Sequence, residues 1–199
     1  MREWWLRTAL VLASPRAVFV ALRRDDPDDL SRRSEPVLAI VLLSGVVFVL
    51  STRTAAHLMD DHDYDGLLVA VWTFLAGSLY GGVAYLVLGA LLHLPSVFLG
   101  SQGTYRRSRH VLAFAAVPVA LSLAFWPVKL ALYGSDLFHQ GGSDAGGGAR
   151  VFEVLGLVFL AWSACLLVIG VRAVHGWSWA RAGVAAAAPA AAVAALLAF

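Results

Sequence analysis

One lysine and one glutamate stand inside two long apolar stretches of the sequence. Lys129 lies four residues from the end of the stretch 111–133, and Glu153 lies two residues into the stretch 151–171. Ionisable side chains within a membrane span mark functional sites by default. At a shallow depth, however, such side chains reach the headgroups at little cost. We therefore predict a Lys129–Glu153 ion pair near one membrane surface, and we favour a structural role over a role in transport.

A compact basic patch precedes the stretch 111–133. Arg106, Arg107 and Arg109 fall within the six residues 105–110 (YRRSRH). Arginines at a membrane surface attract anionic lipids, and each residue contributes about 1 kcal/mol of binding free energy. These arginines are candidates for contact with anionic lipid or a protein partner, and the alternative, which we favour, is that they only determine the topology.

The remaining reactive residues form no recognisable catalytic or metal-binding motif. Residues 61–66 match the opening of a calcium-binding loop, but the twelfth position is Trp72 where a bidentate glutamate is needed. The histidines show no H-E-x-x-H spacing, and neither a G-x-S-x-G nor a Walker sequence occurs. Cys165 is the single cysteine, so there is no intramolecular disulfide. We predict a protein that is not an enzyme and that uses no metal and no cofactor.

Two glycines define a packing face in the stretch 66–92. Gly77 and Gly81 are four residues apart, which places both on the same side of a helix. A small-xxx-small spacing lets another backbone approach closely within a membrane. We predict packing inside one helix bundle, and the alternative is a homo-oligomer interface.

Composition identifies the class of protein that must position these residues. Of 199 residues, 60% are hydrophobic and 14% are charged, whereas soluble domains carry about 25% charged residues. A single soluble core of this length cannot cover so much apolar surface. The sequence therefore predicts an all-α integral membrane protein.

Five apolar segments are candidates for spanning helices. The first is 17 residues long, or about 26 Å as a helix, and the third contains Pro118 and Pro127, which remove hydrogen bonds from a helix. We predict a bundle of five transmembrane helices over residues 36–199, with the spans 36–52, 66–92, 111–133, 151–171 and 179–199.

The distribution of arginine predicts an orientation for these helices. If five helices cross the membrane, twelve arginines lie on the same side of the membrane as the N-terminus and two lie on the opposite side. Because Lys and Arg are retained in the cytoplasm, we expect a cytoplasmic N-terminus and an outer C-terminus. The net charge of +2 is too small to indicate nucleic acid.

Residues 1–35 are predicted to form a cytoplasmic, interfacial amphipathic segment, because the apolar run 9–13 is too short for a cleavable signal. The alternative is a poorly ordered polar tail. Aromatic side chains anchor proteins at the headgroup level, which predicts four anchors: Trp4, Trp5, Trp177 and Trp179. The apolar side chains of the segment are expected to face the acyl boundary: Trp4, Trp5, Leu12, Val18, Phe19 and Leu22.

Several stretches of the chain resemble the Yip-domain family, and in particular its bacterial, actinobacterial-type branch. They are 14–19 (SPRAVF), 105–118 (YRRSRHVLAFAAVP), 126–138 (WPVKLALYGSDLF) and 171–181 (VRAVHGWSWAR). The resemblance implies the five-span architecture of these Rab-GTPase-interacting membrane proteins. The eukaryotic members have a longer cytosolic tail, and bacteria lack Rab-driven vesicle traffic, so the GTPase partner does not carry over.

Two functions are compatible with this sequence. The resemblance and the lack of a catalytic motif favour a non-enzymatic membrane organiser or partner-binding protein in a bacterial plasma membrane. The alternative is a small transporter or lipid-handling protein that uses the proline-broken third segment, which would need a polar cavity at the membrane midplane. The expected partners are membrane lipids and a protein at the cytoplasmic face.

Overall fold

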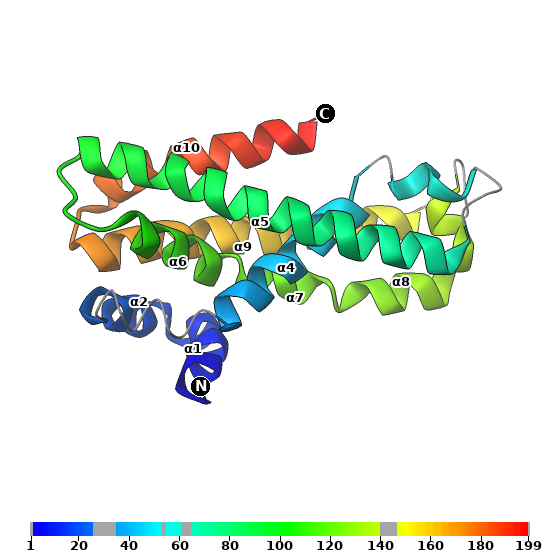
Figure 1. Ribbon diagram of the computed structural model, residues 1–199, viewed down its shortest axis with the longest axis horizontal. Coiled ribbons are helices and arrows are strands. Elements are labelled where there is room, and N and C mark those ends of the chain that lie inside the picture. Colours follow the sequence, from blue (N-terminus) through cyan, green and yellow to red (C-terminus); the bar gives the residue numbers. More distant parts are fainter. Residues whose placement is uncertain (1, 26–34, 53–54, 61–64, 140–146, 199) are drawn as a thin grey trace.

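The computed structural model describes residues 2–25, 35–52, 55–60, 65–139 and 147–198, which form helices and connecting turns without a strand. Figure 1 shows an elongated bundle in which the long helices run along the same axis. The α-helices are α1 (Arg2–Ala13), α2 (Pro15–Arg24), α4 (Glu35–Leu50), α5 (Gly66–Phe98), α6 (Tyr105–Ala115), α7 (Val117–Ser122), α8 (Phe125–Tyr133), α9 (Gly147–His175) and α10 (Trp179–Ala198). Two short 3-10 helices are η1 (Ala55–Asp60) and η2 (Gly134–Phe138).

Four helical stretches among the described residues are long and apolar enough to cross a membrane. They are Gly66–Phe98, Tyr105–Phe138, Arg150–His175 and Trp179–Leu196. The first predicted span corresponds to Pro36–Leu50, which is apolar but shorter than the other four. Helix α5 continues to Phe98, beyond the predicted end at residue 92.

The third predicted span is divided into α6, α7 and α8. The divisions fall at Ala116 and at residues 123–124, a few residues before Pro118 and Pro127. A proline has no N–H to donate to the carbonyl four residues earlier, and its ring crowds that turn. The two prolines therefore account for the position of both divisions.

Helices α4 and α5 cross at very close range. A β-carbon on Gly77 would lie 2.7 Å from the Cα atom of Val46, and one on Gly81 would meet the carbonyl oxygen of Val41. Close to these residues along both helices, the rings of Phe48 on α4 and Tyr80 on α5 stack with centroids 4.2 Å apart. The predicted glycine face therefore lies against α4 within this bundle.

The N-terminal helices lie against the bundle, with α2 packed on α9 (Figure 1). Val18, Phe19 and Leu22 on α2 are buried in the protein core. Gly170 of α9 makes room for this contact, since a β-carbon there would lie 2.9 Å from Cε1 of Phe19. The prediction that these three side chains face lipid is wrong, because the amphipathic pattern gives an apolar face but does not say what covers it.

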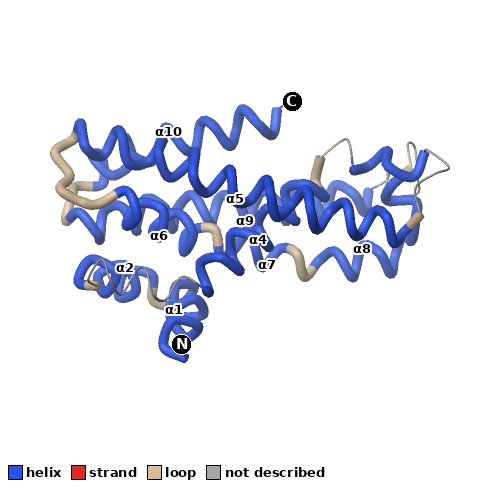
Figure 2. The backbone as a smooth tube through the Cα atoms, viewed as in Figure 1, coloured by secondary structure: helices blue, strands red, loops and turns tan. Residues whose placement is uncertain are grey.

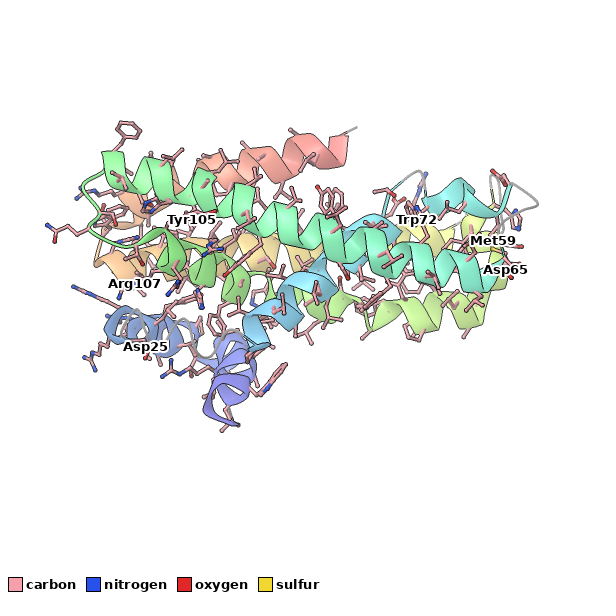
Figure 3. The ribbon with its side chains drawn as sticks, viewed as in Figure 1. Asp25, Met59, Asp65, Trp72, Tyr105 and Arg107 are labelled. Atoms are coloured by element: carbon pink, nitrogen blue, oxygen red, sulfur yellow. The ribbon has the colours of Figure 1, made fainter. Side chains whose placement is uncertain are left out.

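The bundle has two distinct ends (Figure 2). One end holds α2, the turn between α5 and α6, and the turn between α9 and α10; we call it the basic end. The opposite end holds η1, η2 and the start of α5, where Asp65 caps the helix by accepting a hydrogen bond of 2.8 Å from the Leu68 N–H. Figure 3 shows Arg107 and Asp25 at the basic end, with Met59 and Asp65 at the other.

Candidate functional site

The basic patch is positioned by the first turns of α6. Thr104 caps this helix, and its hydroxyl oxygen accepts a hydrogen bond of 3.3 Å from the Arg107 N–H. Arg106 is exposed, whereas Arg107 and Arg109 are half-buried. Thus the three arginines that the sequence singled out have different surroundings.

Arg109 lies along α5 between two tyrosines. Its guanidinium carbon is 5.1 Å from the ring centroid of Tyr85 and 4.6 Å from that of Tyr105. A β-carbon on Gly89 would collide with the aliphatic part of Arg109, so the glycine is what allows this position. The Tyr105 hydroxyl donates a hydrogen bond of 2.7 Å to the Leu86 carbonyl, which fixes one of the two rings. Arginine over an aromatic face is stabilised by the ring quadrupole.

Arg107 connects α6 to the N-terminal helices. One of its terminal nitrogens, Nη2, donates a hydrogen bond of 3.2 Å to the backbone carbonyl oxygen of Asp25, and Figure 3 shows the two residues at the same end of the bundle. The Asp25 carboxylate forms an ion pair with Arg7 of α1. The end of α2 is therefore held by contacts to both α1 and α6.

The turn between α9 and α10 adds two further arginine–aromatic pairs, both with tryptophan. The guanidinium carbon of Arg172 lies 4.4 Å from the Trp179 ring, and that of Arg181 lies 4.6 Å from the Trp177 ring. The ring of His175 also stacks on the Trp177 ring, with centroids 4.4 Å apart. Trp177 and Trp179, two of the four tryptophans predicted as anchors, are thus each in contact with an arginine.

A loop crosses the basic end beside His175. The Nδ1 atom of His175 is 3.2 Å from the Ser101 hydroxyl oxygen, which also accepts a hydrogen bond of 2.9 Å from the Gly103 N–H. On both sides of this contact, Gly100 and Gly176 have φ angles of +82° and +70°, which favour glycine. Two arginines lie beside these glycines: an Nη atom of Arg181 is 3.2 Å from the position of a β-carbon on Gly100, and one of Arg23 is 3.4 Å from that on Gly176.

Of the two N-terminal tryptophans predicted as anchors, Trp5 has an exposed side chain, and its anchoring role stays a prediction. The side chain of Trp4 lies outside the described residues. Leu12 packs against the hydrophobic core.

Lys129 and Glu153 lie on α8 and α9, away from the basic end. The Lys129 ammonium is 4.3 Å from the Trp126 ring centroid and 5.7 Å from that of Phe152, the residue just before Glu153. The Glu153 side chain is exposed. These rings give the lysine an environment that sequence reasoning did not anticipate, and the ion pair stays a prediction.

The described residues contain no group of three His, Cys, Asp or Glu side chains that could hold a metal ion. Of the calcium-like segment, residues 61–64 lie outside the described part of the chain, and Asp65 serves as the cap of α5. Cys165 is an exposed free cysteine.

Sequence reasoning found the three arginines of α6 but not the wider cluster around them. Arg23, Arg172 and Arg181 lie at the same end of the bundle on α2, α9 and α10, and helices α2, α6 and α10 all pack on α9. A local signal existed for one pair, because Trp177 and Arg181 are four residues apart across the start of a helix. No local signal connects these residues to Arg107 or Arg109.

A family model described as the Yip1 domain matches residues 9–199. No curated protein and no solved structure matches the chain.

Proposed function

Because the chain belongs to the Yip1 domain family, a family of membrane proteins, we propose that it is a non-enzymatic organiser of a bacterial plasma membrane that holds anionic partners at its basic end. The observation that carries the proposal is the collection of arginines contributed by α2, α6, α9 and α10. The described residues give no comparable support to the transport alternative.

Aromatic contacts make these arginines suited to a membrane surface. A guanidinium that lies flat on a ring keeps its N–H edge directed outward, and it can donate two hydrogen bonds to a phosphate or carboxylate. Arg109, Arg172 and Arg181 each lie over such a ring. Tyrosine and tryptophan favour the headgroup level, so the pairs supply both an anchor and a cation at the same depth.

The proposal includes α4 as a fifth, short spanning helix, with the N-terminus in the cytoplasm and the C-terminus outside. Helix α4 is packed on α5 along the glycine face, so it shares the environment of a candidate span. A short apolar helix is accommodated by local thinning of the bilayer, at a modest cost for each ångström of mismatch. The basic end is then cytoplasmic, in keeping with the retention of arginine on that side.

Copurification from native membrane tests this function. Lipids and proteins retained by the wild-type chain are identified by mass spectrometry and compared with those retained by the variant Arg106→Gln/Arg107→Gln/Arg109→Gln. We expect the variant to lose anionic phospholipids or a specific protein. Arg150→Gln, which removes an exposed charge at the opposite end, is the control. Identical lipids and proteins from the triple variant and the wild type would refute the proposal.

A further inference from the structure

An open groove of about 680 Å³ lies where α5 ends and α10 begins. One wall consists of Phe98, Leu99 and Gly100, and the other includes Ser178, Arg181 and Val184. The walls lie at the adjoining ends of two candidate membrane spans that pack against each other, as Figure 1 shows. The groove is mainly apolar: the Phe98 side chain is 89% exposed and Val184 is 62% exposed. Apolar surface left open at the end of two spans needs an apolar cover.

The Arg181 side chain lines this groove. One of its Nη atoms donates a hydrogen bond to the Leu99 carbonyl across the groove, and its guanidinium lies over Trp177. These contacts engage one N–H and one face of a group that carries five N–H donors. Within the described residues, no carboxylate forms an ion pair with it.

The charge around the groove is positive. Arg23 lies beside the turn that leads into α10, with an Nη atom 3.4 Å from the position of a β-carbon on Gly176. The carboxylate of Asp25, the residue that follows α2, is already engaged by Arg7. Helix α10 also begins here, and the N-terminal end of a helix dipole favours a negative charge. The groove therefore combines apolar walls with positively charged side chains around it.

We propose that this groove binds one anionic phospholipid, with the phosphate at Arg181 and one acyl chain along Phe98 and Val184. An anionic phospholipid matches both features, because its phosphate accepts hydrogen bonds from a guanidinium and its chain covers the apolar walls. This inference deepens the function proposed above and rests on it. It names a site separate from the arginines of α6.

Native mass spectrometry of the full chain, released from nanodiscs of phosphatidylcholine and phosphatidylglycerol, measures the site directly. We expect Arg181→Gln to weaken phosphatidylglycerol binding about fivefold, which corresponds to the contribution of one basic residue near a membrane surface. Binding of phosphatidylcholine should not change. Arg24→Gln removes an exposed charge from α2 and should change binding by less than about twofold, since screening weakens exposed charges at a distance.

A second variant tests the apolar part of the groove without changing its charge. Val184→Trp fills the space for the acyl chain and should also reduce phosphatidylglycerol binding. Val83→Trp, at an exposed valine of α5, should not. Thermal unfolding in detergent shows whether each variant remains folded.

Three results would overturn the inference. Arg181→Gln could weaken binding no more than Arg24→Gln does, or Val184→Trp could leave binding unchanged. A dimer that disappears with Val184→Trp would instead show that a second copy of the chain occupies the groove. Each result is distinct from failure of the proposed function, which would appear as unchanged copurification in the α6 triple variant.

Discussion

Gly77 presents its carbonyl oxygen to Gly45 so closely that a β-carbon on residue 45 would collide with it. The same crossing brings Gly81 against the Val41 carbonyl. Close approach of two backbones increases van der Waals contact, which is a main source of helix association in a membrane. Because these glycines have no side chain, the backbone of the short helix α4 can pack directly against the backbone of α5.

This crossing predicts that a single methyl group on α5 weakens the bundle. Gly81→Ala should lower the free energy of unfolding by about 1–3 kcal/mol, as overpacking of a tight site does. Gly82→Ala is the matched control, because a β-carbon on the neighbouring Gly82 meets nothing within 4 Å. Unfolding in mixed detergent measures both variants. Equal stability of the two would show that the α4–α5 crossing is not close.

The contact of α2 with the bundle leads to a second prediction. Phe19 is fully buried against α9, so Phe19→Ala should cost about 3–5 kcal/mol if the whole bundle unfolds together. If only α1 and α2 detach, hydrogen exchange should instead become faster in those helices alone. Leu10→Ala, at an exposed residue of α1, should leave exchange unchanged. Unchanged exchange and stability in Phe19→Ala would contradict the docking of α2.

Local patterns in the sequence account for much of the fold. Long apolar stretches specified α5, α9 and α10, because the length needed to cross a bilayer is fixed by its thickness. The prolines at 118 and 127 indicated where the third segment is interrupted, since their effect on a helix acts within one turn.

Tertiary contacts could not be predicted from local sequence patterns, and the reason is again physical. The apolar face of α2 is covered by α9 and not by lipid, and an amphipathic pattern is the same in both cases. Arg172 lies on Trp179, but the sequence gives no indication that the end of α9 that carries Arg172 packs on α6. Such convergence depends on how helices distant in the chain pack together.

The topology gives a third prediction. With a cytoplasmic basic end and five spans, a reporter fused after Phe199 should be active only outside the cytoplasm. A fusion within the loop 100–104, between α5 and α6, should be active only inside, and it serves as the internal control. Cytoplasmic activity of the C-terminal fusion would contradict the proposed count of five spans.

The last prediction concerns Lys129 and Glu153. If the two form the predicted ion pair, Lys129→Met should destabilise the protein, and adding Glu153→Gln should restore part of the loss, because breaking a desolvated pair costs more than replacing both members. The structure shows a different stabilising contact for Lys129: its ammonium lies 4.3 Å from the ring centroid of Trp126. A cation over a ring contributes about 0.5–2 kcal/mol, and Trp126→Leu would remove it. A double-mutant cycle for each pair, measured by thermal unfolding in detergent, separates the two contributions. Coupling of Lys129 to Trp126 without coupling to Glu153 would rule out the ion pair and leave the lysine held by aromatic rings.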